Sequence, residues 1–223
     1  MPDAFLLNSE DWGFGIFLID EKSQRWYEQN LSKIREQQNF CEVLGQFIMM
    51  MKQVVYPATR IPLILKQCLS LNNENLVRTI ESALLQAKSI FLPQELQADF
   101  AKDVCSFFLA KTKKDAKDGN SSMAKFCAQI AINFMFDKEN LEKGFAWVNE
   151  HAGKIFIEGD DTGVETTQEH RYSILKKVFA CGFFTEEQRA SLRDKVLGSD
   201  DSDKGKRVGK VCDEILPSAE LKA

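Results

Sequence analysis

Side chains that commonly carry acid–base or metal chemistry are scarce in this chain. Its only histidines, His151 and His170, each follow a glutamate and stand nineteen positions apart. A hydrolytic zinc site on a helix needs two histidines one turn apart with a glutamate between them, in the order H-E-x-x-H. Neither histidine has a partner at that spacing, so we expect both to be surface or helix-end residues.

Other catalytic and metal-binding patterns are missing or incomplete. The sequence has no G-x-x-x-x-G-K-[ST] phosphate loop and no G-x-S-x-G nucleophile elbow. Two acidic stretches, from Glu158 and from Asp200, approach the spacing of an EF-hand calcium loop. The first begins with glutamate in place of aspartate, and the second has Val211 where the bidentate glutamate is needed. We therefore predict no catalytic residue, no metal ligand and no cofactor in this chain.

The cysteines are more typical of a packed core than of a reactive site. They are widely spaced, include no C-x-x-C pair and have no histidine nearby in the sequence, which favours reduced and buried thiols. The N-terminus also lacks the basic and apolar regions of a secretion signal. Both observations favour a cytoplasmic protein. The six residues are Cys41, Cys68, Cys105, Cys127, Cys181 and Cys212.

Composition excludes several classes of protein. The 223 residues are 44% hydrophobic and 28% charged, which is typical of an ordinary globular chain that can bury a sizeable core. The longest apolar stretches, such as Phe47 to Met51, are far too short to span a membrane. The net charge of −4 would repel a polyanion. We expect neither a membrane nor a nucleic acid as partner.

Helical periodicity dominates from Asp20 onward. Helices are expected over about residues 21–36 and 39–56, and Pro57 should end the second one. Capping residues and prolines predict where the other helices begin. These starts lie near Thr59, at Asn72 or Asn73, at Pro93, near Met123, at Asp137, and at the capping-box spacings of Thr166 with Glu169 and Thr185 with Gln188.

The connections are predicted from charge, glycine and proline. The charge run from Lys111 to Ser122 should be a solvated surface loop, and Ile157 to Thr166 should be a second, acidic loop. Gly182 and Gly198 should end helices in the left-handed conformation. A short helix over 208–215 should stop at Pro217, and the new helix that begins at Ser218 has no body before the sequence stops, which suggests a truncated last helix.

These elements predict an all-α fold. Helix pairs begin near residues 39, 74, 122 and 166, a spacing of roughly forty to fifty residues that lies in or near the range of helical-hairpin repeats. We expect an irregular right-handed α-solenoid of HEAT-like hairpins over residues 21–223. Residues 1–20 should form an extended linker with a short strand at Phe14 to Ile19, where the residues are β-branched and aromatic.

Motifs at both ends of the chain resemble one family. Together they are similar to the helical C-terminal domain of the zinc aminopeptidases related to aminopeptidase N, over about residues 5–222. The chain departs from the family pattern at Leu7 for proline, Tyr172 for tryptophan and Ser202 for threonine. The N-terminal motifs are Leu6-Leu7-Asn8, Gly13-Phe14-Gly15 and Leu18-Ile19-Asp20, and the C-terminal ones are Arg171-Tyr172, Asp200-Asp201-Ser202-Asp203-Lys204-Gly205, Cys212, Pro217 and Lys222.

The resemblance implies a non-catalytic domain. In that family the zinc helix and the amine-binding G-x-M-E-N motif belong to an earlier catalytic domain, so this chain alone should not hydrolyse peptides and should bind no zinc. It would cover the active-site chamber, help to gate or bind peptide substrates, and contact the catalytic and β-sandwich domains of the same enzyme or of a separate subunit. The alternative is a stand-alone helical scaffold that binds other proteins.

Four residues are candidates for contacts. Arg171 with Tyr172 would face a peptide or another domain, since guanidinium suits a carboxylate. The alternative, which is the commoner one for helical arginines, is that Arg171 is a surface or helix-stabilising residue. Trp12 and Phe14 would pack either on the β-sandwich domain or over the first helices of this chain. If partner domains pack there, an exposed apolar patch is expected around Leu6 to Phe17.

Overall fold

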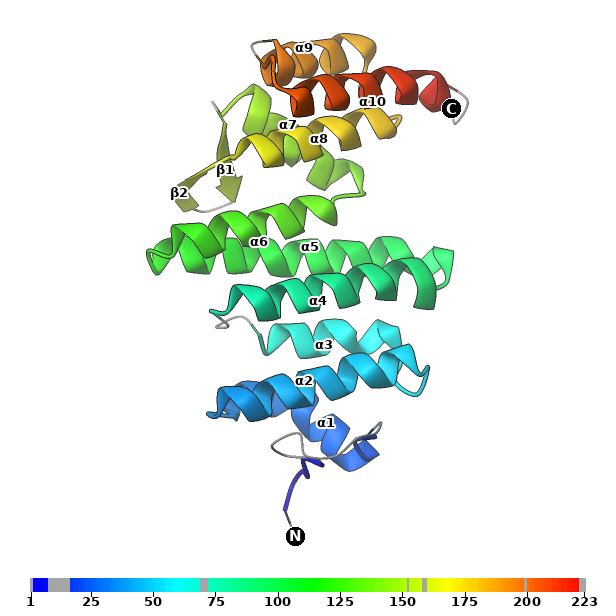
Figure 1. Ribbon diagram of the computed structural model, residues 1–223, viewed down its shortest axis with the longest axis vertical. Coiled ribbons are helices and arrows are strands. Elements are labelled where there is room, and N and C mark those ends of the chain that lie inside the picture. Colours follow the sequence, from blue (N-terminus) through cyan, green and yellow to red (C-terminus); the bar gives the residue numbers. More distant parts are fainter. Residues whose placement is uncertain are drawn as a thin grey trace. The chain divides into compact units, whose positions relative to one another are not determined.

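The computed structural model describes residues 2–7, 17–68, 72–151, 153–157, 160–198 and 200–220 (Figure 1). Helices hold 74% of these residues, and the strands among them form one small antiparallel pair. The prediction of a mostly helical protein is therefore confirmed. Half of the predicted N-terminal strand, residues 14–16, falls outside the described residues, and residues 17–20 belong to no strand.

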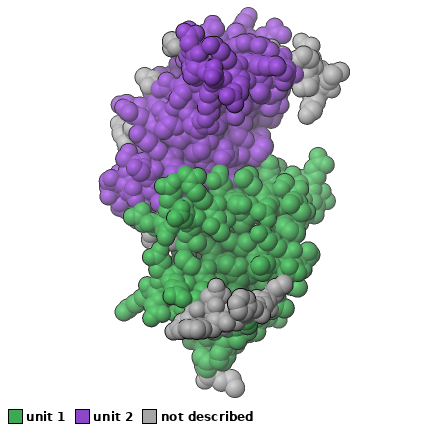
Figure 2. All heavy atoms as spheres, viewed as in Figure 1, with its two compact units in different colours: residues 1–103 green, residues 104–223 purple. Residues whose placement is uncertain are grey.

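The chain divides into two compact units, residues 1–103 and 104–223, which are coloured separately in Figure 2. Each unit has its own set of buried apolar side chains, because the helices in each have apolar residues at helical spacing. The first unit contains α1 (Glu21–Asn30), η2 (Leu31–Lys33), α2 (Gln37–Lys52), η3 (Ala58–Arg60), α3 (Ile61–Lys66), α4 (Glu74–Gln86), the π-helix η4 (Ala87–Phe91) and the start of α5 (Gln94–Lys117).

Helix starts in the first unit follow the capping residues of the sequence. Asp20 caps α1 by accepting a hydrogen bond from the Ser23 amide at 3.1 Å, and Asn73 caps α4 by accepting from the Leu76 amide at 3.1 Å. Pro62 lies in the first turn of α3. The predicted start at Asn73 is thus confirmed, because its side chain satisfies an amide that a helix start leaves unpaired. The start predicted near Thr59 falls in η3, and α3 itself begins at Ile61, with Pro62 in its first turn as expected.

The end of α2 differs from the expectation. The helix stops at Lys52 rather than at Tyr56, because Val54 takes a left-handed conformation with φ 60°. The Val54 amide then donates to the Met51 carbonyl at 2.9 Å and the Val55 amide to the Met50 carbonyl at 3.0 Å, which is the pair of bonds of a Schellman motif. As a result Val54 and Val55 leave the buried stripe, and the Val54 side chain is 79% exposed.

A buried polar cluster joins α1 to the segment that follows α2. Glu28 is 8% exposed and accepts hydrogen bonds from the Tyr56 hydroxyl at 2.7 Å and from Arg60 Nη2 at 2.5 Å. Burial, followed by the hydrogen bond to Glu28, raises the pKa of Tyr56. The carboxylate is buried here because a cation and a hydroxyl satisfy its oxygens.

The second unit is built around α8. It contains the end of α5, then α6 (Ser121–Asn133), α7 (Lys138–Asn149), β1 (Lys154–Ile157), β2 (Asp160–Glu165), α8 (Gln168–Ala180), α9 (Glu186–Leu197) and α10 (Asp203–Glu220). Helices α6, α7, α9 and α10 all contact α8. Its buried residues therefore lie on several sides of the helix: His170, Tyr172, Ile174, Leu175, Val178 and Phe179.

Helix starts in the second unit were partly predicted. Asp137 caps α7, and Thr185 with Gln188 forms a complete capping box at α9, as expected. Gly198 follows α9, but its φ of −58° is right-handed, and Gly182 is not left-handed either. The glycines with positive φ among the described residues are Gly119 and Gly153 instead, so the prediction of left-handed helix ends at Gly182 and Gly198 is wrong.

The predicted loop over Lys111 to Ser122 is mostly helix. Helix α5 continues to Lys117, Gly119 makes the turn, and Asn120 caps α6 through the Met123 amide at 3.3 Å. The loop prediction fails because Lys111 and Asp115 are not solvated. Lys111 is 1% exposed, and its ammonium lies 3.1 Å from Oδ2 of Asp115 one turn later.

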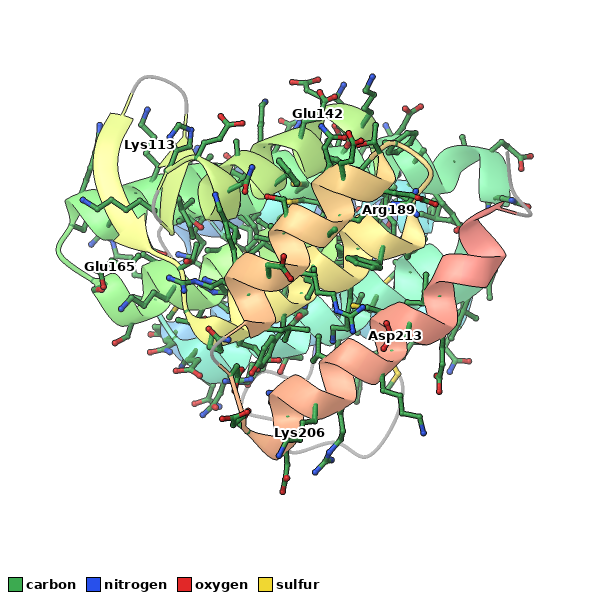
Figure 3. The ribbon with its side chains drawn as sticks, turned by 90° about the horizontal axis from the view of Figure 1, so that it is seen from above. Lys113, Glu142, Glu165, Arg189, Lys206 and Asp213 are labelled. Atoms are coloured by element: carbon green, nitrogen blue, oxygen red, sulfur yellow. The ribbon has the colours of Figure 1, made fainter. Side chains whose placement is uncertain are left out.

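The predicted acidic loop over Ile157 to Thr166 is instead the second strand of a hairpin. Strands β1 and β2 pair antiparallel, with Lys154 opposite Glu165 and Ile155 opposite Val164. β-branched residues opposite one another favour this pairing over a loop. Glu165, labelled in Figure 3, ends β2 shortly before α8 begins.

The last helix also differs from the expectation. Helix α10 runs through Pro217 to Glu220, so neither the predicted break nor a new helix at Ser218 is present. The fixed φ of proline fits a helix, although proline has no amide to donate to the preceding turn. Arg193 of α9 holds α10 by a bidentate pair with Asp213, at 2.5 and 3.1 Å, and Asp213 lies on the side of α10 that borders α9 (Figure 3).

Candidate functional site

The candidate residues Arg171 and Tyr172 lie in the first turn of α8, where a capping box fixes the backbone. Thr167 is the capping residue: its hydroxyl accepts from the His170 amide at 3.2 Å, while Nδ1 of His170 accepts from the Thr167 amide at 3.2 Å. The predicted box of Thr166 with Glu169 is therefore wrong by one residue. Thr166 still belongs to the extended chain, and its amide donates to the Gly153 carbonyl at 2.6 Å.

His170 is a structural bridge between two helices. It is 2% exposed, and its Nε2 lies 2.9 Å from the Lys125 carbonyl of α6. Because Nδ1 accepts a hydrogen bond, Nε2 carries the proton and donates it to that carbonyl. Burial lowers the pKa of His170. The expected helix-end position is confirmed, but the side chain is buried and neutral rather than on the surface.

Arg171 anchors the base of the hairpin. Its Nε donates to the Thr166 hydroxyl at 3.0 Å, and its guanidinium lies against Gly153. A Cβ added to Gly153 would lie 2.5 Å from Nη2 of Arg171, which is too close. Gly153 also has φ 81°, a conformation that favours glycine, so both the space and the backbone require glycine here. These contacts support the helix-stabilising interpretation of Arg171. Contact with a peptide or another domain stays a prediction.

Tyr172 points the other way, into the contact between α8 and α10. It is 3% exposed, and its hydroxyl donates to Oδ2 of Asp200. The same carboxylate oxygen accepts from Nε2 of Gln168 at 3.0 Å, and Oδ1 accepts from the Ser202 amide at 3.1 Å. Hydrogen bonds from Ser202 and then from Tyr172 lower the pKa of Asp200 to about 2. Asp200 therefore stays ionised at neutral pH and serves as an acceptor.

The acidic segment after Asp200 begins α10 and holds no EF-hand geometry in its described residues. Ser202 caps the helix by accepting from the Gly205 amide at 3.0 Å. A Cβ on Gly205 would lie 2.7 Å from Cγ of Asp200, so the carboxylate occupies the space that glycine leaves. Lys204 forms an ion pair with Glu169 and lies 6.0 Å from the centre of the Tyr172 ring. We call Gln168, Tyr172, Asp200, Ser202 and Gly205 the α8–α10 joint.

A second buried polar cluster lies between α5 and α6 and was not anticipated. Lys111 pairs with Asp115, whose Oδ2 also lies 3.6 Å from the Cys127 thiol of α6. Burial raises the pKa of Cys127 to about 12, so this thiol is not a nucleophile at neutral pH. The spacing of Phe100, Val104 and Phe108 continues in four-residue steps to Thr112, and this periodicity could have predicted that the helix extends into the charge run.

All six cysteines are free thiols, and Cys68, Cys105, Cys127 and Cys212 are buried, as the sequence indicated for a reduced core. Burial raises the pKa of Cys105 to about 12 and that of Cys212 to about 11. Trp12 and Phe14 lie outside the described residues. Over the ranges given above, no three histidine, cysteine, aspartate or glutamate side chains lie close enough to hold a metal ion, and no helix is both long and apolar enough to cross a membrane.

The N-terminal face of the first unit carries exposed apolar side chains. Phe5 is 56% exposed, Leu7 is 47% exposed and Leu18 is 49% exposed. The segment is fixed in place, since the Phe5 amide donates to the Ser23 hydroxyl at 3.0 Å and Gln46 Nε2 donates to the Leu7 carbonyl at 2.7 Å. An ordered backbone thus presents these side chains to solvent, near the position where the sequence predicted an apolar patch.

No protein-family model matches this chain, and no curated protein is significantly similar to it in sequence.

Proposed function

We propose that this chain is a non-catalytic helical domain of a zinc aminopeptidase related to aminopeptidase N. Its helices would form an irregular right-handed α-solenoid of HEAT-like hairpins that covers the active-site chamber and helps to gate or bind peptide substrates. Zinc and the residues that perform hydrolysis would belong to a separate catalytic domain, in the same enzyme or in another subunit. The proposal includes a cytoplasmic location, which is supported by free and mostly buried thiols.

The α8–α10 joint is the observation that carries this proposal. The resemblance rests on motifs at both ends of the chain. Its C-terminal motifs include Arg171-Tyr172 and the Asp200 to Gly205 segment, with 28 positions between Tyr172 and Asp200. The two motifs meet in the α8–α10 joint. There the Tyr172 hydroxyl donates to Asp200, and Gly205 leaves room for the Asp200 carboxylate. The contact between the two motifs supports the proposed helical fold, and function then follows by analogy with the family.

The exposed apolar side chains at the N-terminal face give independent support. An apolar patch on an ordered surface is a common sign of contact with another domain or protein. In the proposed enzyme, Phe5 and Leu7 would pack on a neighbouring domain. In the alternative, a stand-alone helical scaffold, no neighbouring catalytic domain exists and this surface has no effect on peptide hydrolysis.

The first test is aminopeptidase activity, measured with amino-acid anilides and added zinc on this chain and on the longest natural polypeptide that contains it. Activity only in the longer protein supports the proposal. If the longest natural polypeptide and this chain are both inert, the scaffold alternative replaces it.

A second test uses the N-terminal face. In the longer protein, the double variant Phe5→Ser and Leu7→Ser should lower activity or loosen domain association, while the unfolding midpoint of this chain alone should change little, because both side chains are already exposed. Phe183→Ser is a matched control, since Phe183 is 49% exposed but lies in the second unit. Equal effects of the double variant and the control would argue against a domain contact at Phe5 and Leu7.

A further inference from the structure

The N-terminal segment and the first two helices enclose a small open pocket. Its volume is about 360 Å³, near the lower end of the range for small-molecule sites. Seven residues from the N-terminal segment, α1, the turn after it and the start of α2 line the pocket: Asp3, Ala4, Leu6, Trp26, Tyr27, Ile34 and Asn39. All belong to the first unit and to the described residues.

The outer wall of this pocket is held by hydrogen bonds on both sides of its lining residues. Lys22 Nζ donates to the Pro2 carbonyl at 3.0 Å, the Phe5 amide donates to the Ser23 hydroxyl at 3.0 Å, and Gln46 donates to the Leu7 carbonyl at 2.7 Å. Ala4 and Leu6 line the pocket, whereas Phe5 and Leu7 are exposed.

The inner wall is aromatic. Trp26 and Tyr27 meet edge to face, with ring centroids 5.3 Å apart and planes at 83°. Tyr27 is 4% exposed and is fixed further by an edge-to-face contact with Phe47 at 6.5 Å. The pocket therefore offers apolar contacts to a ligand, and aromatic rings such as those of Trp26 and Tyr27 can also attract a cation.

The charge of the lining favours a cation. Asp3 is the only charged residue among those that line the pocket, and it is exposed at the rim, without an ion pair to any described residue. No lysine, arginine or histidine lines the pocket, and the ammonium of the neighbouring Lys22 is directed at the Pro2 carbonyl. A cationic group in the pocket would lie near both a carboxylate and two aromatic side chains.

We propose that this pocket binds a small primary amine that carries an aromatic or branched apolar group. The apolar group would enter between Leu6, Ile34 and the two aromatic rings, and the ammonium would lie beside Asp3. This inference does not depend on the proposed aminopeptidase function, because it rests only on the residues of the pocket.

The test is a titration of the full chain with phenethylamine, monitored through the NMR signal of the Trp26 indole N–H. This signal is assigned as the one that is missing from the spectrum of Trp26→Phe. A ligand of this size in an open pocket should bind with a dissociation constant on the order of 1 mM. The uncharged analogue 2-phenylethanol should bind about threefold to fivefold more weakly, because it lacks the ion pair and the cation–π contact.

Two variants separate the pocket from general charge effects. Asp3→Asn should weaken phenethylamine about threefold and leave 2-phenylethanol unchanged. Glu21→Gln removes an exposed carboxylate of α1 that does not line the pocket, and it should change neither. The inference is overturned if up to 20 mM phenethylamine leaves the Trp26 signal unmoved, if the amine and the alcohol bind equally, or if Asp3→Asn and Glu21→Gln have the same effect.

Discussion

The α8–α10 joint predicts opposite effects for the same substitution at two glycines of one helix. Gly205 and Gly209 are both buried in α10, four residues apart. A Cβ at Gly205 would lie 2.7 Å from Cγ of Asp200 and 2.9 Å from its carbonyl oxygen. A Cβ at Gly209 would meet Leu197 at 3.5 Å and Arg193 at 3.8 Å, which are ordinary van der Waals distances. Gly205→Ala must therefore displace Asp200, whereas Gly209→Ala displaces nothing.

The magnitudes follow from two opposing contributions. Alanine in place of glycine inside a helix favours folding by about 0.5–1 kcal/mol. Forcing an extra methyl group into a filled space costs about 1–3 kcal/mol. Gly209→Ala should thus raise the free energy of unfolding by about 0.5–1 kcal/mol, and Gly205→Ala should lower it by about 1–2 kcal/mol. For a chain of 223 residues, each kcal/mol corresponds to a shift of about 2–4 °C in the unfolding temperature.

Thermal and urea unfolding of the two variants, followed by circular dichroism, measure these effects directly. In a background of Asp200→Ala, two of the three close atoms are gone, so Gly205→Ala should cost less there than in the natural chain. Equal stabilisation by both alanine substitutions would refute the close approach of Asp200 to Gly205, and with it the geometry of the joint.

Three other substitutions test separate parts of the structure. Val54→Gly should raise the free energy of unfolding by about 1 kcal/mol, because a left-handed conformation costs a residue with a side chain about 1–2 kcal/mol, whereas Val55→Gly next to it should be destabilising; urea unfolding measures both. The folded-state pKa of His170 lies below its ordinary value of 6.5, so the unfolded chain binds the extra proton first and stability should fall as the pH drops below about 6.5. His170→Gln keeps a capping side chain without a titrating group, and its urea midpoint should depend less on pH between 7 and 5; equal pH dependence would contradict the buried neutral imidazole. Lys111→Met leaves Asp115 buried without its cation and should cost about 3–5 kcal/mol, while adding Asp115→Leu should recover most of that loss; a cost below about 1 kcal/mol for the single variant would mean that Asp115 is solvated.

Local patterns predicted the helices well where apolar spacing and capping agreed. In α2 the residues expected to be buried are buried up to Met51, because each falls on the side of the helix that faces the core. The prediction fails at Val54, where the chain turns left-handed. Glycine or asparagine normally marks such a turn, and a β-branched valine there gives no signal in the sequence.

Charge runs misled the prediction for a different reason. Lys111 and Asp115 look like solvated residues when each is counted separately, yet together they form a buried ion pair one helical turn apart. Whether such a pair is buried depends on the helix that packs over it, in this unit α6 with Cys127. Burial of this kind is a property of tertiary packing, which single-residue preferences do not contain.

In the candidate site, too, local features could be predicted from the sequence, whereas tertiary contacts could not. The resemblance to the aminopeptidase family singled out Arg171, Tyr172 and the segment from Asp200. It gave no means of knowing that the Tyr172 hydroxyl bonds Asp200, because that contact needs α10 to return alongside α8. The capping function of Ser202 was visible in principle, as a serine that directly precedes a helical pattern.

The geometry of the joint also determines what its residues say about function. Three residues of the joint have clear structural roles. Tyr172 donates the hydrogen bond, Asp200 accepts it, and Gly205 leaves space for the Asp200 side chain. A motif explained this completely by packing indicates a common fold more strongly than a common chemistry. The proposed peptide gating would therefore depend on surfaces that the joint does not explain. In that proposal, the exposed Phe5 and Leu7 are the candidates for such a surface.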